Sequence, residues 1–190
     1  KHITEAVYSH KSGIKVIPSS ISNRALKGIK IGNLKKALYS LEGLTDFIIV
    51  DGAPGLSNEN VAILESVNNV LIVTNPELPA LTDALKTIRM IEDFGKRIKG
   101  VIVARTGKKE DISTSNIESL LGKKVIAEIP EDSKAREALV KKGILVDLFP
   151  KNKIAISYKK LAADILNETY FEEPEQRFFD RFFNGFRKKN

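Results

Sequence analysis

The sequence predicts a doubly wound α/β domain with a mostly parallel sheet, followed by a C-terminal amphipathic helix. Three observations support this fold class: Ile- and Val-rich segments alternate with helix-length stretches, two of those segments contain continuous apolar runs, and the C-terminal residues combine Phe with basic side chains. Hydrophobic residues make up 42% of the 190 residues, which is enough for one sizeable core. We expect residues 1–171 to form the domain, 172–176 an acidic hinge and 177–190 the helix.

The expected strands are short and apolar. Continuous runs such as Phe47-Ile48-Ile49-Val50 and Val70-Leu71-Ile72-Val73 are typical of strands covered on both faces of a parallel sheet. The five expected strands are 14–18, 46–51, 70–75, 100–105 and 125–129.

The expected helices lie between and after these strands and place apolar residues on one stripe. In the segment 81–94, Thr82 and Asp83 lie where a helix start is capped, and Gly95 lies just past the end. Glu172-Glu173-Pro174-Glu175 ends the domain because Pro cannot continue the preceding helix. The five expected helices are 34–41, 59–67, 81–94, 133–142 and 154–169.

Composition excludes several kinds of site. The chain has no Cys, so disulfides and thiolate chemistry are excluded and a reducing cytosol is expected. The two histidines, His2 and His10, precede the first expected strand, which disfavours a His-based metal site or catalytic triad. No apolar run approaches the ~20 residues that cross a bilayer, and no signal peptide is visible.

The net charge of +7 is concentrated at the C-terminus. Residues 177–190 carry five basic residues and one acidic residue, so +4 of the +7 lies there. The other 176 residues carry a net charge of only +3, which is usual for a soluble protein surface. A specific nucleic-acid partner is therefore not expected.

The ends of the strands carry the candidate site, because ligands of open α/β sheets bind beyond the carboxyl ends of the strands. Asp51 ends an apolar run and is able to hold a Mg²⁺-bound water, and Gly55 is able to bring a backbone N–H close to a phosphate. Asp51 could equally cap a loop. Pro130-Glu131-Asp132 follows another strand, where Ser133 could be a helix N-cap.

Four motifs in order resemble the MinD branch of the MinD/ParA family of deviant P-loop ATPases: "DFIIVDGAPGL", "VLIVTNPELPALTDALKTIRMIEDFG", "GVIVARTG" and "VIAEIPEDSKAREAL". The resemblance implies ATP and Mg²⁺ as cofactors. It implies that Asp51 is the Walker B Asp and Gly55 the switch glycine that senses the γ-phosphate.

The resemblance also implies further roles. Pro130, Glu131 and Asp132 match the loop that lines the adenine, and Arg105 matches the basic half of an Asn-Arg pair that frames the base. The Asn of that pair is Ala104 in this chain, which weakens the expected side-chain reading of adenine. Asp83 matches a position at the dimer and partner face.

One family motif is missing from the sequence. Nothing fits the Gly-rich P-loop with its Lys and Ser/Thr, which in the family precedes this whole region. We therefore expect an N-terminally incomplete P-loop NTPase fold that is inactive alone, and the start at Lys1 favours a P-loop upstream of this chain.

The C-terminal segment has an aromatic face and a basic face. At about 100° per residue its Phe side chains fall within roughly 140° of arc, opposite the basic residues. These are the marks of a helix that lies at a membrane interface, although docking on its own domain is the alternative. The expected membrane-binding residues are Phe178, Phe179, Phe182, Phe183, Phe186, Arg187, Lys188 and Lys189.

The function predicted from sequence is that of a MinD-like ATPase. We expect it to bind ATP and Mg²⁺, to form a homodimer, to associate from the cytoplasm with the inner face of the cell membrane, and to position a partner protein at the division site. A segregation or flagellar-number ATPase of the same family, a receiver-type signalling domain and a non-catalytic membrane adaptor are the alternatives.

Overall fold

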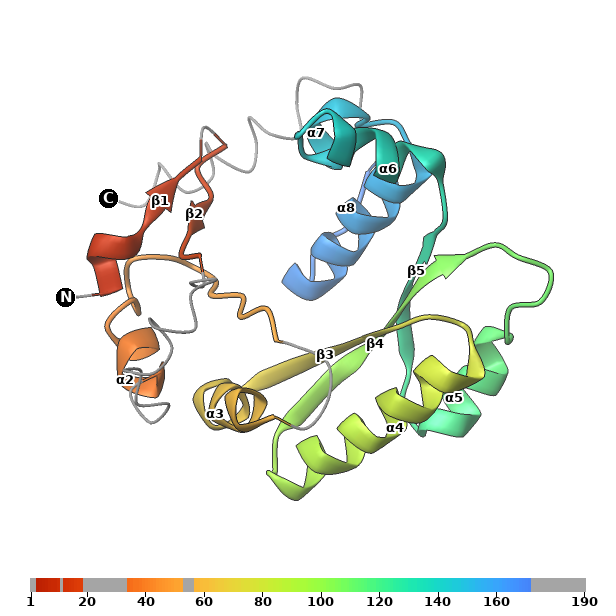
Figure 1. The fold of residues 1–190 in the computed structure, drawn as a ribbon, viewed down its shortest axis with the longest axis horizontal. Coiled ribbons are helices and arrows are strands. Elements are labelled where there is room, and N and C mark those ends of the chain that lie inside the picture. Colours follow the sequence, from red (N-terminus) through yellow and green to blue (C-terminus); the bar gives the residue numbers. More distant parts are fainter. Residues whose placement is uncertain (1–2, 11, 19–33, 53–56, 172–190) are drawn as a thin grey trace. The chain divides into compact units, whose positions relative to one another are not determined.

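The computed structural model describes residues 3–10, 12–18, 34–52 and 57–171 (Figure 1). The expected hinge and amphipathic helix, 172–190, and Gly55 lie outside these residues. The chain divides into two compact units, Lys1–Ile102 with Ile112–Val125, and Val103–Asp111 with Ile126–Asn190.

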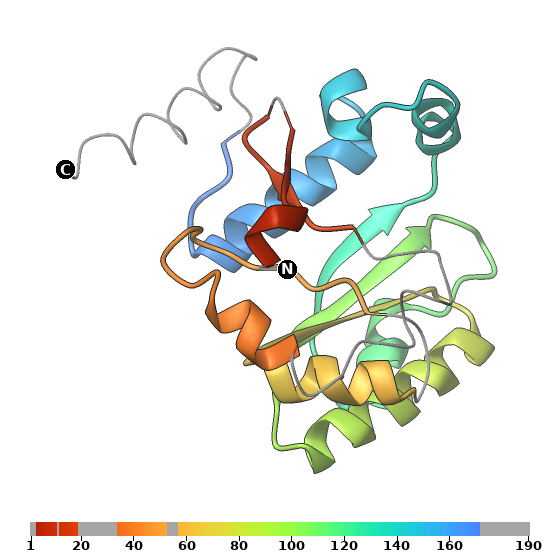
Figure 2. The same cartoon turned by 60° about the vertical axis from the view of Figure 1, so that its left-hand side comes forward.

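The first unit begins with a 3-10 turn, η1 (Ile3–Ala6), and a small hairpin, drawn in red in Figures 1 and 2. In it β1 (Tyr8–Ser9) pairs antiparallel with β2 (Lys15–Val16), with Tyr8 opposite Val16. Gly13, at a φ of +86°, reverses the chain, and its N–H donates to the His10 carbonyl at 2.9 Å. A strand therefore lies within the expected range 14–18, but its expected place in the parallel sheet is wrong, because this local turn pairs it with β1.

The main sheet has the order β3-β4-β5, with β3 (Asn69–Thr74), β4 (Arg97–Thr106) and β5 (Val125–Pro130). The α/β fold with a parallel sheet that the sequence predicts is confirmed. Val101, Ile102 and Val103 of β4 are buried in succession, as expected for a strand covered on both faces. The edge strand β3 differs, because Ile72 is buried whereas Val73 is 65% exposed.

The apolar run at 46–51 does not form a strand in the structure. No strand pairing is assigned to it among the described residues, and Ile49 is 92% exposed. Hydrophobicity alone does not make a strand, since the backbone N–H and C=O groups also need a neighbouring strand.

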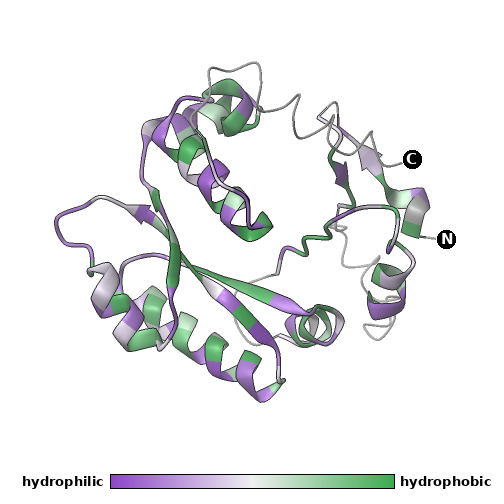
Figure 3. Ribbon diagram, turned by 180° about the vertical axis from the view of Figure 1, so that it is seen from behind, coloured by the Kyte–Doolittle hydropathy of each residue, from purple (hydrophilic) through white to green (hydrophobic). Residues whose placement is uncertain are grey.

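Helices of the first unit pack their apolar residues inward. In α4 (Leu78–Asp93) the buried residues Leu81, Ala84, Ile88 and Ile91 follow helical spacing, and apolar and polar residues alternate along this helix in Figure 3. It contacts β3 and α5 (Thr114–Leu121). Among the described residues of this unit, the remaining helices are α2 (Leu34–Tyr39) and α3 (Asn58–Ser66).

The second unit holds α6 (Ser133–Val140), α7 (Leu145–Leu148) and α8 (Lys153–Leu166). Asn152 caps the start of α8 by accepting from the Ile154 N–H at 2.8 Å, and Asn167 ends it in the left-handed conformation. The sequence predicted α6 and α8 but neither α7 nor α5. Within the part of the chain that the structure describes, no helix is long and apolar enough to cross a membrane.

Candidate functional site

The ends of β4 and β5 meet in the second unit. The Glu131 N–H donates to the Thr106 carbonyl at 2.9 Å, which joins the residues that follow the two strands. The Lys108 ammonium lies 3.0 Å from the Glu131 carboxylate. Four residues predicted from sequence lie at this edge: Arg105, Pro130, Glu131 and Asp132.

Arg105 adopts a backbone conformation that is unusual for its type. Its φ is +60°, in the left-handed region, and its side chain is exposed. This conformation costs a non-glycine residue about 1–2 kcal/mol, and such strain is frequent at functional sites. The half-buried Ala104 precedes it, so the guanidinium has no neighbouring Asn amide beside it in the sequence.

The loop after β4 is held by one carboxylate. Asp111 Oδ2 accepts hydrogen bonds from the N–H groups of Gly107 at 2.7 Å and Lys108 at 2.9 Å. With the Lys108–Glu131 pair, these contacts fix the path of the chain next to Arg105. The segment that follows β4 is therefore held in one conformation by side-chain contacts.

Asp132 starts α6 and is the helix N-cap, so the suggestion that Ser133 caps it is wrong. Its carboxylate accepts from the Lys134 N–H at 2.8 Å. That hydrogen bond, one from the Asn152 side chain, and the charges of Lys153 and Lys134 hold the pKa of Asp132 below its ordinary value. Asp132 thus has a structural role whether or not it contacts a ligand.

An open pocket of about 320 Å³ adjoins the start of α6 and is lined by Lys134, Phe149, Pro150, Lys151 and Asn152. The Lys134 ammonium lies 4.7 Å from the centre of the Phe149 ring. The Phe149 ring and the ammonium groups of Lys134 and Lys151 line this pocket, and such a lining suits a flat, electron-rich or anionic ligand. The sequence analysis missed this pocket, because only tertiary packing brings the end of α7 to the start of α6.

Asp51 lies in the first unit with an exposed carboxylate. A Cβ on the adjacent Gly52 would lie 3.6 Å from Asn60 Oδ1 in α3, so this turn runs close to that helix. Among the described residues no group of three His, Cys, Asp or Glu side chains could hold a metal. One carboxylate fits Mg²⁺ only where phosphates and waters supply the other oxygens, as is usual for this ion.

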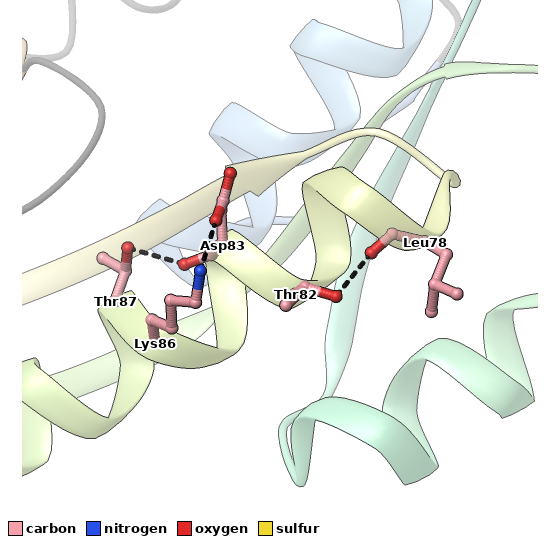
Figure 4. Close-up of polar contacts among 5 residues, drawn as sticks. All are labelled: Leu78, Thr82, Asp83, Lys86 and Thr87. Atoms are coloured by element: carbon pink, nitrogen blue, oxygen red, sulfur yellow. Dashed lines mark hydrogen bonds and ion pairs between the residues drawn. The ribbon is translucent and has the colours of Figure 1, made fainter.

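Asp83 lies in α4 beyond its first turn, not at its cap (Figure 4). The helix starts earlier because Pro79 suits the first turn, and its N-cap is Glu77. Asp83 is 77% exposed and pairs with Lys86 at 3.1 Å. Its carboxylate therefore faces solvent, where a partner is able to reach it.

A family model described as ParA, NUBPL iron-transfer P-loop NTPase, matches residues 27–166. The chain belongs to the MinD/ParA family of P-loop ATPases. The predicted family is thereby confirmed.

Relatives within the MinD/ParA family include an ATP-binding protein of Methanocaldococcus jannaschii, 28% identical over 187 residues, covering 96% of this chain and 71% of the relative. The septum site-determining protein MinD of Thermotoga maritima is 31% identical over 175 residues, covering 86% of this chain and 63% of the relative. This chain therefore spans about two thirds of the length of these relatives.

Two solved structures are similar in fold. MinD of Pyrococcus horikoshii, complexed with Mg-ADP, has a TM-score of 0.80 and 27% identity, covering 86% of this chain and 68% of that one. The cell division ATPase MinD of Pyrococcus furiosus has a TM-score of 0.82 and 28% identity, covering 88% and 71%. Nucleotide binding is thus a property of the MinD/ParA family, whereas the roles of the individual residues above remain predictions.

Proposed function

We propose that this chain is the larger part of a MinD-like ATPase that binds and hydrolyses Mg·ATP and forms a dimer. The protein associates with anionic membrane through residues 177–190. It positions a partner protein, and the process it serves is placement of the division site. The observation that carries the proposal is the joined edge of β4 and β5. The Glu131 N–H to Thr106 contact joins the two segments to which we assign the base, and it supports the proposal in a fold similar to a Mg-ADP complex.

The residues of this edge suit the base of a nucleotide. The Arg105 guanidinium is able to lie against an aromatic ring, and the loop 130–132 supplies backbone groups that are able to read the base edge. Since Ala104 lacks an amide, we expect backbone groups to contribute more to base recognition than the Asn-Arg pair of the family would.

Asp51 and Gly55 are the proposed phosphate-side residues. Asp51 would hold a metal-bound water through its carboxylate, and Gly55 would let a backbone N–H approach the terminal phosphate. Bound Mg²⁺ would supply neutralisation of charge on the phosphate oxygens. A P-loop is required as well, because its backbone N–H groups and Lys cradle the phosphates.

The test is ATP hydrolysis by the chain joined to the P-loop segment of a family member. Asp51→Ala should lower turnover by about a hundredfold or more, because the metal loses its orienting carboxylate. Asp46→Ala, at the other end of the same segment, is the matched control and should keep full turnover. Unchanged turnover of the Asp51 variant would show that Asp51 only caps a loop. A joined chain without any turnover would favour a non-catalytic adaptor.

A further inference from the structure

The helix α6 (Ser133–Val140) turns its two largest aliphatic residues toward solvent. Leu139 is 78% exposed and Val140 76% exposed, whereas the small Ala138 is the residue that is buried. Amphipathic surface helices normally bury their large aliphatic residues. Singly exposed aliphatic residues are common on protein surfaces, whereas adjacent apolar residues rimmed by polar ones mark interaction sites.

The inner face of α6 is occupied by charged residues that pack on an aromatic ring. Lys134 and Lys141 lie 4.7 and 5.2 Å from the centre of the Phe149 ring. Glu137 links them, with carboxylate distances of 2.6 Å to Lys134 and 2.8 Å to Lys141. These contacts fix the rotation of the helix, so the outward position of Leu139 and Val140 is set by packing.

The outer face of α6 is also basic. Arg136, Leu139 and Val140 are spaced i, i+3 and i+4 and so share one face. Among the described residues neither Arg136 nor Lys142 has an ion-pair partner, and the only acidic residue of α6, Glu137, is engaged by two lysines. We name Arg136, Leu139, Val140 and Lys142 the outer α6 patch.

The backbone holds Lys142 at the end of this patch. The Lys142 N–H donates to the Leu139 carbonyl at 3.0 Å, and the Gly143 N–H donates to the Ala138 carbonyl at 3.0 Å. Lys142 itself has a φ of +50°, a position that favours glycine. Lys142 therefore follows the aliphatic pair at the C-terminal end of α6, where a positive charge is favourable.

The positive charge and the exposed aliphatic side chains of the outer α6 patch indicate the kind of partner that it binds. A second copy of the chain meeting it face to face would bring Arg136 and Lys142 against like charges. Leu139 and Val140 protrude, and the pocket lined by Lys134 and Phe149 contains neither of them. A protruding aliphatic pair flanked by two cations that have no ion-pair partner within the described residues matches an anionic lipid surface, which takes apolar groups below and cations at its headgroups.

We propose that the outer α6 patch is a second membrane contact, which inserts Leu139 and Val140 into an anionic bilayer while Arg136 and Lys142 lie at its headgroups. This inference extends the membrane association proposed above for residues 177–190, yet it involves different residues. Two weak contacts on one chain bind a surface more tightly than either alone.

The absence of Cys from the sequence gives a direct test. Leu139→Cys, labelled with an environment-sensitive fluorophore, is mixed with phosphatidylcholine vesicles that contain or lack phosphatidylglycerol. We expect a blue shift, and quenching by brominated lipid, only with the anionic vesicles. Leu120→Cys in α5 is an exposed aliphatic control and should keep its emission. Phe186→Cys reports the C-terminal segment in the same way.

Fluorophores at positions 139 and 186 test the outer α6 patch and the C-terminal segment separately. A blue shift at position 186 with none at position 139 would overturn this inference, leave the proposed function intact and point to an acidic protein as the partner of the patch. A shift at 139 without one at 186 would support the patch and contradict the C-terminal assignment. No shift at either position would overturn both.

The charges have their own test. Combined Arg136→Gln and Lys142→Gln should lower affinity for anionic vesicles by about fivefold per charge and leave binding to neutral vesicles unchanged. Arg97→Gln with Lys99→Gln, two exposed basic residues of β4, removes the same charge elsewhere and should have a smaller effect. Equal losses for the two pairs would show only a general electrostatic attraction and would contradict a specific contact.

Discussion

Arg105 combines a strained backbone with an exposed cationic side chain, and the two properties can be separated by substitution. Arg105→Gly should relieve the left-handed φ, which costs a non-glycine residue about 1–2 kcal/mol. It also makes the unfolded chain more flexible, by roughly 0.5–1 kcal/mol. We expect a net gain in the free energy of unfolding of up to about 1.5 kcal/mol, measured by urea denaturation.

Arg105→Ala is the matched variant, because it removes the guanidinium but keeps the strain. Both variants should bind nucleotide more weakly in the P-loop-complete protein, and only the Gly variant should be more stable. If Arg105→Gly were instead less stable than the original chain, its side chain would have a structural role that outweighs the strain.

Asp132 gives a prediction for pH. Its folded-state pKa is lowered, chiefly by the hydrogen bond from the Lys134 N–H. A depressed carboxyl pKa contributes stability that is fully present above the ordinary Asp pKa of 3.8 and is lost as the pH falls through the lower folded-state value. Asp132→Ala should therefore be less stable than the original chain at neutral pH, and the difference in the free energy of unfolding should become smaller in acid as the charge-dependent part is lost.

Asp132→Asn distinguishes capping from charge. Asn is as good an N-cap as Asp, so this variant should keep most of the stability at neutral pH and lose the pH-dependent part. A stability difference between Asp132→Ala and the original chain that stayed constant down to strongly acidic pH would contradict the assigned cause of the pKa shift.

At the scale of elements, α4 presents Asp83 on a solvent-facing surface. Asp83→Ala should lower the free energy of unfolding by no more than about 0.5 kcal/mol, because an exposed i,i+3 ion pair contributes little. We expect the same variant to weaken dimer or partner binding, measured by analytical ultracentrifugation or pull-down. Lys86→Ala breaks the same ion pair and should leave that binding intact. A large loss of stability with normal binding would make Asp83 a purely structural residue.

The elements that sequence predicted well are those whose pattern is local. Spacing of Leu81, Ala84, Ile88 and Ile91 identified α4, and the Ile- and Val-rich segment 100–105 identified the strand β4. The start of α4 was misplaced, because Thr82 and Asp83 look like caps in the sequence whereas Pro79 lies in its first turn.

Elements that depend on distant partners were predicted less well. The run 46–51 is apolar enough for a strand but is not paired in the structure, and 14–18 pairs with its own hairpin. For the site, the strand-end rule identified Arg105 and the 130–132 loop, and the Glu131 N–H donates to the carbonyl of Thr106, the residue after Arg105. It could not identify Phe149, whose place beside Lys134 follows from the packing of α7 and α6.

At the scale of the whole molecule, nucleotide binding depends on a motif that this sequence does not contain. The 190-residue chain alone should not bind Mg·ATP with submillimolar affinity, because no Gly-rich loop with Lys is present to cradle the phosphates. Calorimetry on the chain alone and joined to a family P-loop segment measures the difference. Submillimolar binding by the chain alone would show that the strand-end edge suffices.

The proposed membrane association also depends on the whole molecule. A single interfacial helix binds weakly and reversibly, so two copies brought together by dimerisation should bind far more tightly than one. If ATP drives dimerisation, membrane binding becomes a response to the bound nucleotide. This coupling is the central claim, because it joins the strand-end site to the C-terminal residues.

Co-sedimentation with phosphatidylglycerol vesicles tests this claim most directly, with the P-loop-complete protein in ATP and in ADP. We expect strong sedimentation in ATP and little in ADP, and its loss on combining Phe182→Glu and Phe186→Glu, while the domain keeps its cooperative melt. Equal sedimentation in ATP and ADP, or persistent sedimentation of the double variant in ATP, would contradict the account.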